Sequence, residues 1–235
     1  VDFRIKDRSL TSRQYEFGVQ DKRDGEWRAA QTLSLVGGSW GHAVFQPEAC
    51  NYCDDVFAET ADVVIGDAWL AKYEIDWRGT NVVVTRNPEL RAIFERGAAS
   101  GGLMREDLDL DSVVRTQAGN FRHRRDGLAV RLADDDAAGR WHPRKRVHAG
   151  YPVSPERVAL IRERRAISAT SHEAFAAAKR EGDLAVYLNA IVPLITQYQS
   201  ATKMTFVARL RNRAKREFWK LLAKISSKSR QRIPR

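Results

Sequence analysis

Two cysteines, Cys50 and Cys53, are separated by two residues, and they are the only cysteines among the 235 residues of the chain. Thiolates at this spacing can both reach one metal ion or one cluster iron, because the tight turn between them points both sulfurs the same way. A redox dithiol, half of a zinc site and two buried cysteines are the alternatives. A closed zinc site or an iron–sulfur cluster needs four ligands, and His42 is the only histidine nearby. An iron–sulfur cluster would therefore need two ligands from residues missing from this chain or from a partner.

The residues around the cysteine pair speak against a thioredoxin-like dithiol. That motif follows a strand and opens a helix, whereas Pro47 precedes the pair here and the acidic residues Asp54 and Asp55 follow it. Acids next to the sulfurs raise the pKa of a thiol instead of lowering it. The pair is therefore interpreted as a metal or redox pair in a reducing compartment, with a thioredoxin-like geometry disfavoured.

A second group of residues that could bind a ligand begins at the end of the apolar run Ala61–Gly66. A glycine at the end of a strand lets the backbone come close to a ligand, and Asp67 can hold a ribityl or ribose hydroxyl; a capped turn is the alternative. Gly79-Thr80-Asn81 offers further donors, and Arg86 lies at the far end of the next apolar run. Together these residues predict a cradle for an anion or a flavin phosphate, although the spacing is neither a P-loop nor GxGxxG.

The N-terminal residues predict the elements that lead into these groups. Val1–Lys6 and Gln14–Gln20 alternate between apolar and polar residues, and Glu26–Val36 continues as a third strand. We expect an antiparallel meander. Arg4 and Lys6 share one strand face, which is either a solvated face or a cationic pair aimed at an anionic cofactor.

The middle of the chain predicts further strands and the first helices. Ala61–Gly66 and Thr80–Arg86 are β-branched without alternation, which is typical of strands buried on both faces. Asn87-Pro88-Glu89 begins a helix, because Asn is a good N-cap and Pro suits the first helical position. We expect a short edge strand at Leu103–Leu108 and another helix capped by Asp111.

The remaining residues are increasingly helical. Gln117–Asp134 is mostly helical, and the irregular, basic stretch Trp141–Tyr151 marks a soft boundary between domains at residues 1–150 and 151–235. Ser154-Pro155-Glu156 begins a helix, and Gly182-Asp183 ends it and caps the next. The predicted fold class is α+β: a mixed or antiparallel sheet with flanking helices, followed by a mostly helical C-terminal region. The apolar stripe expected on the last helix before residue 203 consists of Leu184, Tyr187, Leu188, Ile191, Ile195 and Tyr198, with a kink at Pro193.

The net charge of +10 is concentrated in the tail. From Lys203 onward there are 12 Lys and Arg against one acid, whereas the preceding 202 residues hold 28 Lys and Arg against 29 acids. The calculated isoelectric point of 9.9 is thus no argument for a nucleic-acid partner, and we expect none. The tail predicts an amphipathic helix from about Lys203 to Ile225. It either packs on the body or lies on an anionic membrane surface, with Phe218 and Trp219 at the interface.

Three further predictions concern the start of the chain, its location in the cell and a glycine-rich motif. The chain begins at Val1 and enters a strand at once, so we expect it to be the later part of a longer protein. It has no apolar signal region and no apolar run of membrane-spanning length, which favours a cytoplasmic protein, with peripheral attachment at the inner face of the membrane as the alternative. Gly37-Gly38-Ser39-Trp40-Gly41 matches GxSxG formally, as in a serine hydrolase. Pro47 interrupts the helix that a nucleophile elbow requires, so a Gly-rich turn in which Trp40 packs is favoured.

The order and spacing of these motifs resemble the C-terminal domain of the coenzyme F420 hydrogenase/dehydrogenase beta subunit family. The entry strand is represented by Phe3-Arg4-x-Lys6, and the later motif by Gln117 with Arg122–Arg125. The resemblance covers roughly residues 1 to 150 and is closest to the bacterial branch, which is tied by context to polysaccharide synthesis. The central residues that carry it are Cys50-x-x-Cys53-Asp54-Asp55, Ala61-Asp62, Gly66-Asp67-Ala68-Trp69, Gly79-Thr80-Asn81 and Arg86.

The resemblance implies an iron–sulfur flavoprotein that passes electrons between a flavin and a deazaflavin-type or other acceptor. It implies a [4Fe-4S] cluster with Cys50 and Cys53 among its ligands, FAD as the flavin, and coenzyme F420 as a further cofactor candidate. The family's cysteine-rich N-terminal portion lies outside this sequence, so a missing segment or a partner subunit would complete the cluster. Gly66, Asp67, Thr80, Asn81 and Arg86 are expected near the cofactors, with Lys6 as the cationic side chain. The alternative is a non-catalytic relative that acts as a binding or scaffolding module in envelope polysaccharide biosynthesis.

Overall fold

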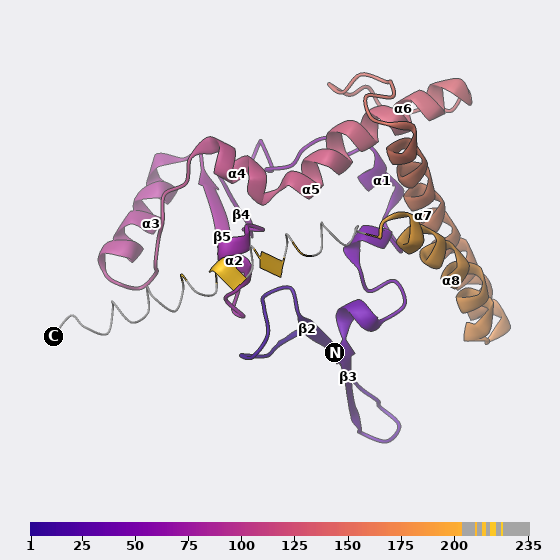
Figure 1. Cartoon of the computed structure of the whole chain (residues 1–235), viewed down its shortest axis with the longest axis horizontal. Helices are drawn as coiled ribbons and strands as arrows, with labels where there is room; N and C mark the ends of the chain where they lie inside the picture. Colours follow the sequence, from indigo (N-terminus) through magenta and orange to yellow (C-terminus); the bar gives the residue numbers. More distant parts are fainter. Residues whose placement is uncertain (204–209, 211–212, 215–216, 220–221, 223–235) are drawn as a thin grey trace. The chain divides into compact units, whose positions relative to one another are not determined.

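The computed structural model describes residues 1–203, 210, 213–214, 217–219 and 222. Antiparallel sheets with short helices make up the N-terminal part, and a long helical hairpin follows (Figure 1). This agrees with the predicted fold class. The chain forms two compact units, one with residues 1–18 and 57–118 and one with residues 19–56 and 119–203. The predicted division at residue 150 stays a prediction.

The first unit contains two strand pairs. β1 (Asp2–Lys6) pairs antiparallel with β2 (Tyr15–Gln20), and Lys6 lies opposite Tyr15. β3 (Trp27–Gln31), whose residues belong to the second unit, follows β2 in a sheet with the order β1-β2-β3, which confirms the predicted meander. β4 (Val63–Asp67) pairs antiparallel with β5 (Asn81–Thr85), and the short helix α2 (Ala71–Glu74) comes between them in sequence.

The prediction that the strands β4 and β5 are buried on both faces was wrong. Ile65 and Val83 are cross-strand partners, and they are 56% and 38% exposed. The reason is topological, since β4 and β5 form a two-stranded antiparallel sheet, whereas continuous burial is typical of parallel sheets covered by helices.

The helices of the first unit begin close to the predicted residues. α3 (Pro88–Ala99) is capped by the side chain of Asn87, as expected. α4 (Leu110–Thr116) is capped by Asp109 instead of Asp111, because the Asp109 carboxylate accepts hydrogen bonds from the backbone and the hydroxyl of Ser112. The edge strand predicted for residues 103–108 is also wrong, because these residues are irregular.

The second unit is mostly helical. Its first segment carries the one-turn helices η1 (Thr32–Ser34), η2 (Trp40–His42) and α1 (Glu48–Asn51). Its second segment begins within α5 (Ala118–Phe121). A π-helix, η3 (Arg122–Asp126), then leads into α6 (Gly127–Ala137). The hairpin consists of α7 (Pro155–Glu181) and α8 (Leu184–Ala201), capped by Ser154 and Asp183 as predicted.

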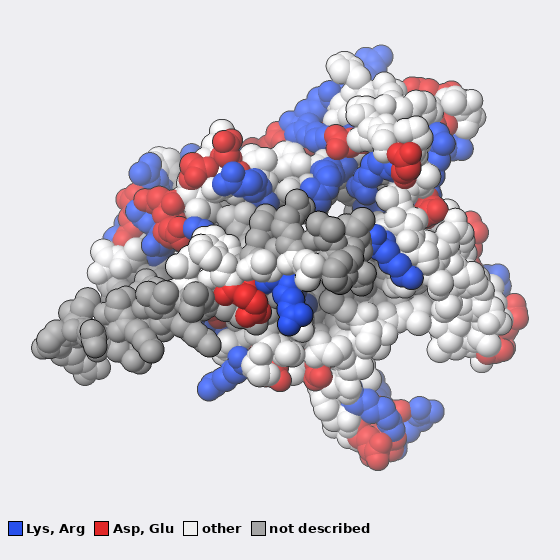
Figure 2. Space-filling view, in the orientation of Figure 1, with Lys and Arg blue, Asp and Glu red and all other residues white. Residues whose placement is uncertain are grey.

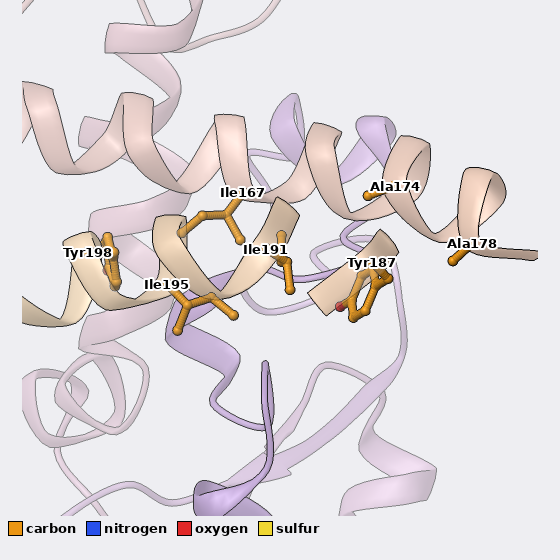
Figure 3. Close-up of a cluster of buried hydrophobic side chains, with 7 residues drawn as sticks. All are labelled: Ile167, Ala174, Ala178, Tyr187, Ile191, Ile195 and Tyr198. Carbon is orange, nitrogen blue, oxygen red and sulfur yellow. The ribbon is translucent and has the colours of Figure 1, made fainter. Parts of the chain in front are cut away.

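The core of the second unit lies between α7 and α8. Ile167 on α7 and Ile191 on α8 are fully buried, and Figure 3 shows them with their neighbours along the two helices. The predicted stripe is confirmed except at Leu184, which is 58% exposed because it begins α8 at the end of the hairpin. α8 continues through Pro193 to Ala201. The buried stripe residues are Tyr187, Ile191, Ile195 and Tyr198.

Two predictions about other segments have different outcomes. The predicted packing of Trp40 was wrong, since its side chain is 71% exposed, while Ser39 caps η2 by accepting a hydrogen bond from the backbone of Gly41. The amphipathic tail helix falls mainly outside the described residues. No helix among the described residues could cross a membrane. Figure 2 shows acidic and basic side chains interspersed over the face in view.

Candidate functional site

The cysteine pair lies at the end of the one-turn helix α1 in the second unit. Pro47 precedes α1, Cys50 is within it and exposed, and Tyr52 is its C-cap. Cys53 follows directly and is partly buried, with its Sγ 3.6 Å from the carbonyl of Asp55. The pair therefore closes a short helix instead of opening a long one, which agrees with the argument against a thioredoxin-like motif.

Asn51 anchors the turn between the two sulfurs. It is 2% exposed, and its side chain donates to Glu48 at 2.8 Å and accepts from Gln46 at 2.9 Å. Its backbone carbonyl accepts a hydrogen bond from Arg131 Nε at 2.8 Å. Because a buried polar group is stable only when it is hydrogen-bonded, these contacts fix the backbone from which both cysteines project.

Tyr52 connects the same turn to a buried carboxylate on α6. Its hydroxyl donates to Asp135 at 2.9 Å, and Asp135 is fully buried. Arg165 and Arg140 also donate to Asp135, at 2.8 Å and 2.7 Å. Burial alone would raise the pKa of Asp135, but the hydrogen bonds from Arg165, Arg140 and Tyr52 together hold that pKa below its usual value. The carboxylate is therefore charged at neutral pH and binds the turn to α6 and α7.

The two acids after Cys53 are matched by basic groups. Asp54 lies 3.3 Å from Lys145 and 3.2 Å from Arg146. Burial would raise the pKa of Asp54, but the interactions with Lys145 and Arg146 lower it overall. Arg124, on the π-helix, donates to the backbone carbonyl of Asp55. The surroundings of the cysteine turn thus include four cationic side chains, on Arg124, Arg131, Lys145 and Arg146, that sequence reasoning did not place there.

The donors for a closed metal site are incomplete within the described residues. No group of three or more His, Cys, Asp or Glu side chains with a metal-binding arrangement occurs there. His42 is buried in η2, and its Nε2 lies 3.4 Å from the side-chain nitrogen of Gln199. Burial lowers the pKa of His42, and Arg164 adds to this effect. Two thiols alone do not fit a four-ligand zinc or iron–sulfur site.

The first unit brings together most of the residues predicted to bind a cofactor. Asp67 and Asn81 are cross-strand partners at one end of the β4–β5 ladder, and Gly66 lies opposite Val82. The carbonyl of Thr80 accepts a hydrogen bond from Ala68 at 2.9 Å. Gly66, Asp67, Thr80 and Asn81 therefore share one end of the sheet, as the sequence predicted.

Cations from β1 reach the same end of this sheet. Arg4 Nη2 lies 3.6 Å from a carboxylate oxygen of Asp67. Lys6 donates to the carbonyl of Ser12 at 3.2 Å and lies over the ring of Tyr15. Partial burial lowers the pKa of Lys6, Arg4 lowers it further, and Asp67 partly offsets both effects. Lys6 is thus close enough to Asp67 for the two charges to interact.

Arg86 lies at the opposite end of the ladder from Asp67. Its backbone nitrogen donates to the carbonyl of Asp62, and its guanidinium donates to the carbonyls of Phe57, Ala58 and Ala61 at 2.8–3.2 Å. The structure therefore gives Arg86 a role in holding the segment before β4. A cofactor contact of Arg86 stays a prediction.

Gly66 is not demanded by the fold. A Cβ placed there would lie 3.7 Å from the side-chain nitrogen of Gln117 and 3.9 Å from Val82, which are ordinary contacts. Gln117 itself donates to the carbonyl of Asp67 at 2.6 Å. The packing of the chain would therefore tolerate a larger residue at position 66, and the glycine leaves open space beside Asp67.

Residues 3–110 match the family model for the C terminus of the coenzyme F420 hydrogenase/dehydrogenase beta subunit. The matched segment includes both cysteines and all six residues predicted to bind a cofactor. It ends before α6 and α7, which supply Arg131 as a partner of Asn51 and Asp135 and Arg165 as partners of Tyr52. The relationship therefore applies to the segment that carries the predicted site. Neither the curated proteins nor the solved structures give a significant match.

Sequence reasoning missed the groups on α6 and α7 that hold the cysteine turn. Asp135 and Arg165 are more than 80 positions from Tyr52 in the chain, so no local spacing connects them. One signal was available, because Arg131 lies among the buried apolar residues Leu128, Val130 and Leu132 of α6. A lone arginine on an apolar helix face indicates a buried polar contact.

Proposed function

We propose that this chain is part of an iron–sulfur flavoprotein oxidoreductase that passes electrons between a flavin and a deazaflavin-type or other acceptor. The match of residues 3–110 to the C terminus of the coenzyme F420 hydrogenase/dehydrogenase beta subunit supports this proposal at the level of the family. The observation that carries it further is the cysteine turn, which buried groups fix in place and basic groups surround.

In this proposal Cys50 and Cys53 provide two thiolates to a cluster whose other ligands come from a preceding segment or a partner subunit. Thiolates bound to iron carry negative charge, and a cationic environment stabilises that charge. Arg131 and Arg124 donate to backbone carbonyls of the turn, while Lys145 and Arg146 offset Asp54. These contacts would keep the two sulfurs oriented alike while the other ligands bind.

The end of the β4–β5 sheet is the proposed contact with FAD. Arg4 and Lys6 provide positive charge for a phosphate, and Asp67 and Asn81 provide groups that bind sugar or ribityl hydroxyls. Gly66 would allow the ligand to approach the backbone. A bound flavin would supply the hydride or electron chemistry, while these residues bind and orient it. Coenzyme F420 is the proposed acceptor candidate.

The flavin contact is tested by titrating FAD with the full chain and following the quenching of flavin fluorescence. We expect Asp67→Ala to weaken binding by about tenfold, which corresponds to about 1.4 kcal/mol. Asp62→Ala is the matched control, because Asp62 is an exposed aspartate beside the other end of the same strand. Equal loss in both variants, or no binding by the wild-type chain, would contradict the proposed contact.

A second function is favoured by one observation, the shortage of metal donors. The chain has two cysteines, and the described residues contain no three-donor group. A non-catalytic module in envelope polysaccharide biosynthesis, related to the bacterial branch of the family, needs no complete cluster. In a bacterial host that depends on this protein, a normal polysaccharide with Cys53→Ser and Asp67→Ala would favour the module. Loss of polysaccharide with either variant would favour the oxidoreductase.

The basic tail is proposed to attach the protein to an anionic membrane surface at the cytoplasmic face. The net charge of +11 from Lys203 onward and the exposed ring of Phe218 support this proposal. Sedimentation with anionic liposomes, comparing the full chain with a chain that ends at residue 203, provides the test. We expect the shortened chain to remain in the supernatant, and equal sedimentation of both would refute membrane attachment by the tail.

A further inference from the structure

A small cavity in the second unit is lined by an unusual number of cationic side chains. It has a volume of about 10 Å³, and its walls include Arg131, Arg157, Arg164 and Arg165 together with His123 and Asn51. The cavity lies between the π-helix, α6 and α7, beside the turn that carries the cysteines. Neither Cys50 nor Cys53 lines it, so the cavity is separate from the predicted metal ligands.

Three of these four arginines have no acidic partner among the residues that the structure describes. Arg165 pairs with Asp135 and Glu48. Arg131, Arg157 and Arg164 form no ion pair within 4.0 Å anywhere in the described part of the chain. Burying a charge without a counter-charge is costly, so proteins usually pair such groups. The cavity therefore concentrates positive charge that the described residues do not neutralise by ion pairs.

Arg131 is the most deeply buried of these cations. It is 3% exposed, and it donates from Nε to Asn51 and from Nη2 to the carbonyl of His123, both neutral acceptors. Its Nη1 lies against Gly127, where a Cβ would approach it to 2.9 Å. Burial and the neighbouring arginines lower the pKa of Arg131 to about 10, so it remains charged at neutral pH.

Arg164, which lines the cavity, also carries a buried donor that is not hydrogen-bonded within the described part of the chain. This donor is Nε, while Nη1 lies 3.3 Å from Nδ1 of His123. Burial, aided by the nearby arginines, lowers the pKa of His123 to about 3. His123 is therefore neutral, its Nδ1 accepts from Arg164, and its imidazole adds no counter-charge. Buried donors without partners are rare in folded proteins and point to a bound species.

We propose that this cavity binds a small inorganic anion of about the size of chloride. The volume is close to the lower limit for one water-sized particle, which excludes tetrahedral oxyanions such as phosphate unless the walls move apart. Chloride is slightly larger than water, and the half-buried side chain of Arg157 can shift outward to admit it. The anion neutralises the charges of Arg131 and Arg164 and accepts a hydrogen bond from Nε of Arg164.

Bound in this way, the anion joins the cysteine turn to α6 and α7. Asn51 and Arg131 both line the cavity, and they are already hydrogen-bonded to each other. An anion that binds only the folded state stabilises it in proportion to the logarithm of its concentration above the dissociation constant. The second unit is thus expected to gain stability from chloride whether or not the cysteines hold a metal.

The first test measures thermal unfolding of the full chain as chloride replaces gluconate at constant ionic strength, because gluconate is too large for the cavity. We expect the wild-type midpoint to rise with chloride and Arg164→Met to lose that rise. Arg162→Met is the matched control, because Arg162 lies two positions away on α7, is exposed and pairs with Asp134 instead of lining the cavity. The control should keep the chloride response of the wild type.

The second test measures chloride directly through the line width of the ³⁵Cl nuclear magnetic resonance signal. We expect Arg164→Met to bind at least about tenfold more weakly than the wild type, which is about 1.4 kcal/mol. If Arg164→Met does not fold, Arg157→Met must show the weaker binding, since its position is half-buried and tolerant. Equal chloride responses of the wild type, the folded cavity variants and Arg162→Met would overturn the site. A stronger effect of sulfate than of chloride on the wild type would overturn the size assignment.

Discussion

Arg131 donates a hydrogen bond at 2.8 Å to the backbone carbonyl of Asn51, the residue that follows Cys50. This contact links α6 to the middle of the CxxC motif across 80 positions of sequence. With the contact between Tyr52 and Asp135, it explains how an exposed, one-turn helix keeps a defined shape. A helix of one turn has little stability of its own, so tertiary contacts must supply it.

The contact between Tyr52 and Asp135 predicts a measurable loss of stability when the hydroxyl is removed. Tyr52→Phe should lower the free energy of unfolding by about 2 kcal/mol, because the hydrogen bond is to a buried charged group. Tyr151→Phe is the control, since the hydroxyl of Tyr151 donates to Asp134 at 3.0 Å from an exposed position. Urea denaturation provides the measurement, and equal losses in both variants would contradict the buried role of Tyr52.

Removal of the buried carboxylate itself should cost more. Asp135→Asn leaves Arg165 and Arg140 with one weaker, neutral acceptor, and breaking a buried ion pair costs about 3–5 kcal/mol. Asp136→Asn is the comparison, because Asp136 is exposed and pairs with His142 at 2.9 Å. Urea denaturation should show a large loss for the first variant and a value close to wild type for the second. Similar small effects in both would show that Asp135 does not hold the turn.

The lowered pKa of His123 predicts how stability depends on pH. Its folded pKa is about 3, against an ordinary value of 6.5, so the unfolded chain takes up a proton first as pH falls. The contribution of neutral His123 is therefore present above about pH 6.5 and is lost progressively toward pH 3. His123→Asn keeps an acceptor for Arg164 but cannot titrate, so its stability should fall less steeply across this range. The exposed His148→Asn is the control, and a slope for His123→Asn equal to the wild-type slope would contradict the prediction.

Substitution of Gly66 should affect ligand binding without affecting the stability of the fold. Gly66→Ala should leave the free energy of unfolding within about 0.5 kcal/mol of wild type, because the added Cβ meets only ordinary contacts. It should nevertheless weaken FAD binding if the ligand approaches the backbone there. Gly79→Ala is the contrasting variant, since Gly79 has φ +85°, which an alanine adopts only with strain. Unchanged flavin affinity in a stable Gly66→Ala protein would remove Gly66 from the proposed site.

Local signals predicted most of the fold. Asn87, Ser154 and Asp183 cap helices where expected, because a capping side chain bonds to backbone groups only two or three residues away. The exposure of Ile65 and Val83 could not be predicted in this way. It depends on which strands pair, and the same β-branched run suits a covered parallel sheet or an open antiparallel pair.

The candidate site shows the same division. Asp67 and Asn81 follow from the order of two adjacent strands, so the sequence placed them together. Asp135, Arg131 and Arg165 come from helices far along the chain, and only folding brings them to the cysteine turn. Arg131 carries a local signal, because it lies between apolar residues of α6, whereas Asp135 and Arg165 carry none, because Asp and Arg are usually exposed.

The central claim, that Cys50 and Cys53 bind iron and sulfide, is tested most directly by anaerobic reconstitution of the full chain with a small thiol present to supply the missing ligands. Iron and acid-labile sulfide retained per chain after desalting are the quantities measured. The double variant Cys50→Ser/Cys53→Ser has no thiols, because the chain has only these two cysteines, and it defines the non-specific background. We predict that the wild-type chain retains both iron and sulfide above this background and that either single variant loses most of them. Equal amounts in the wild type and the double variant would contradict the claim.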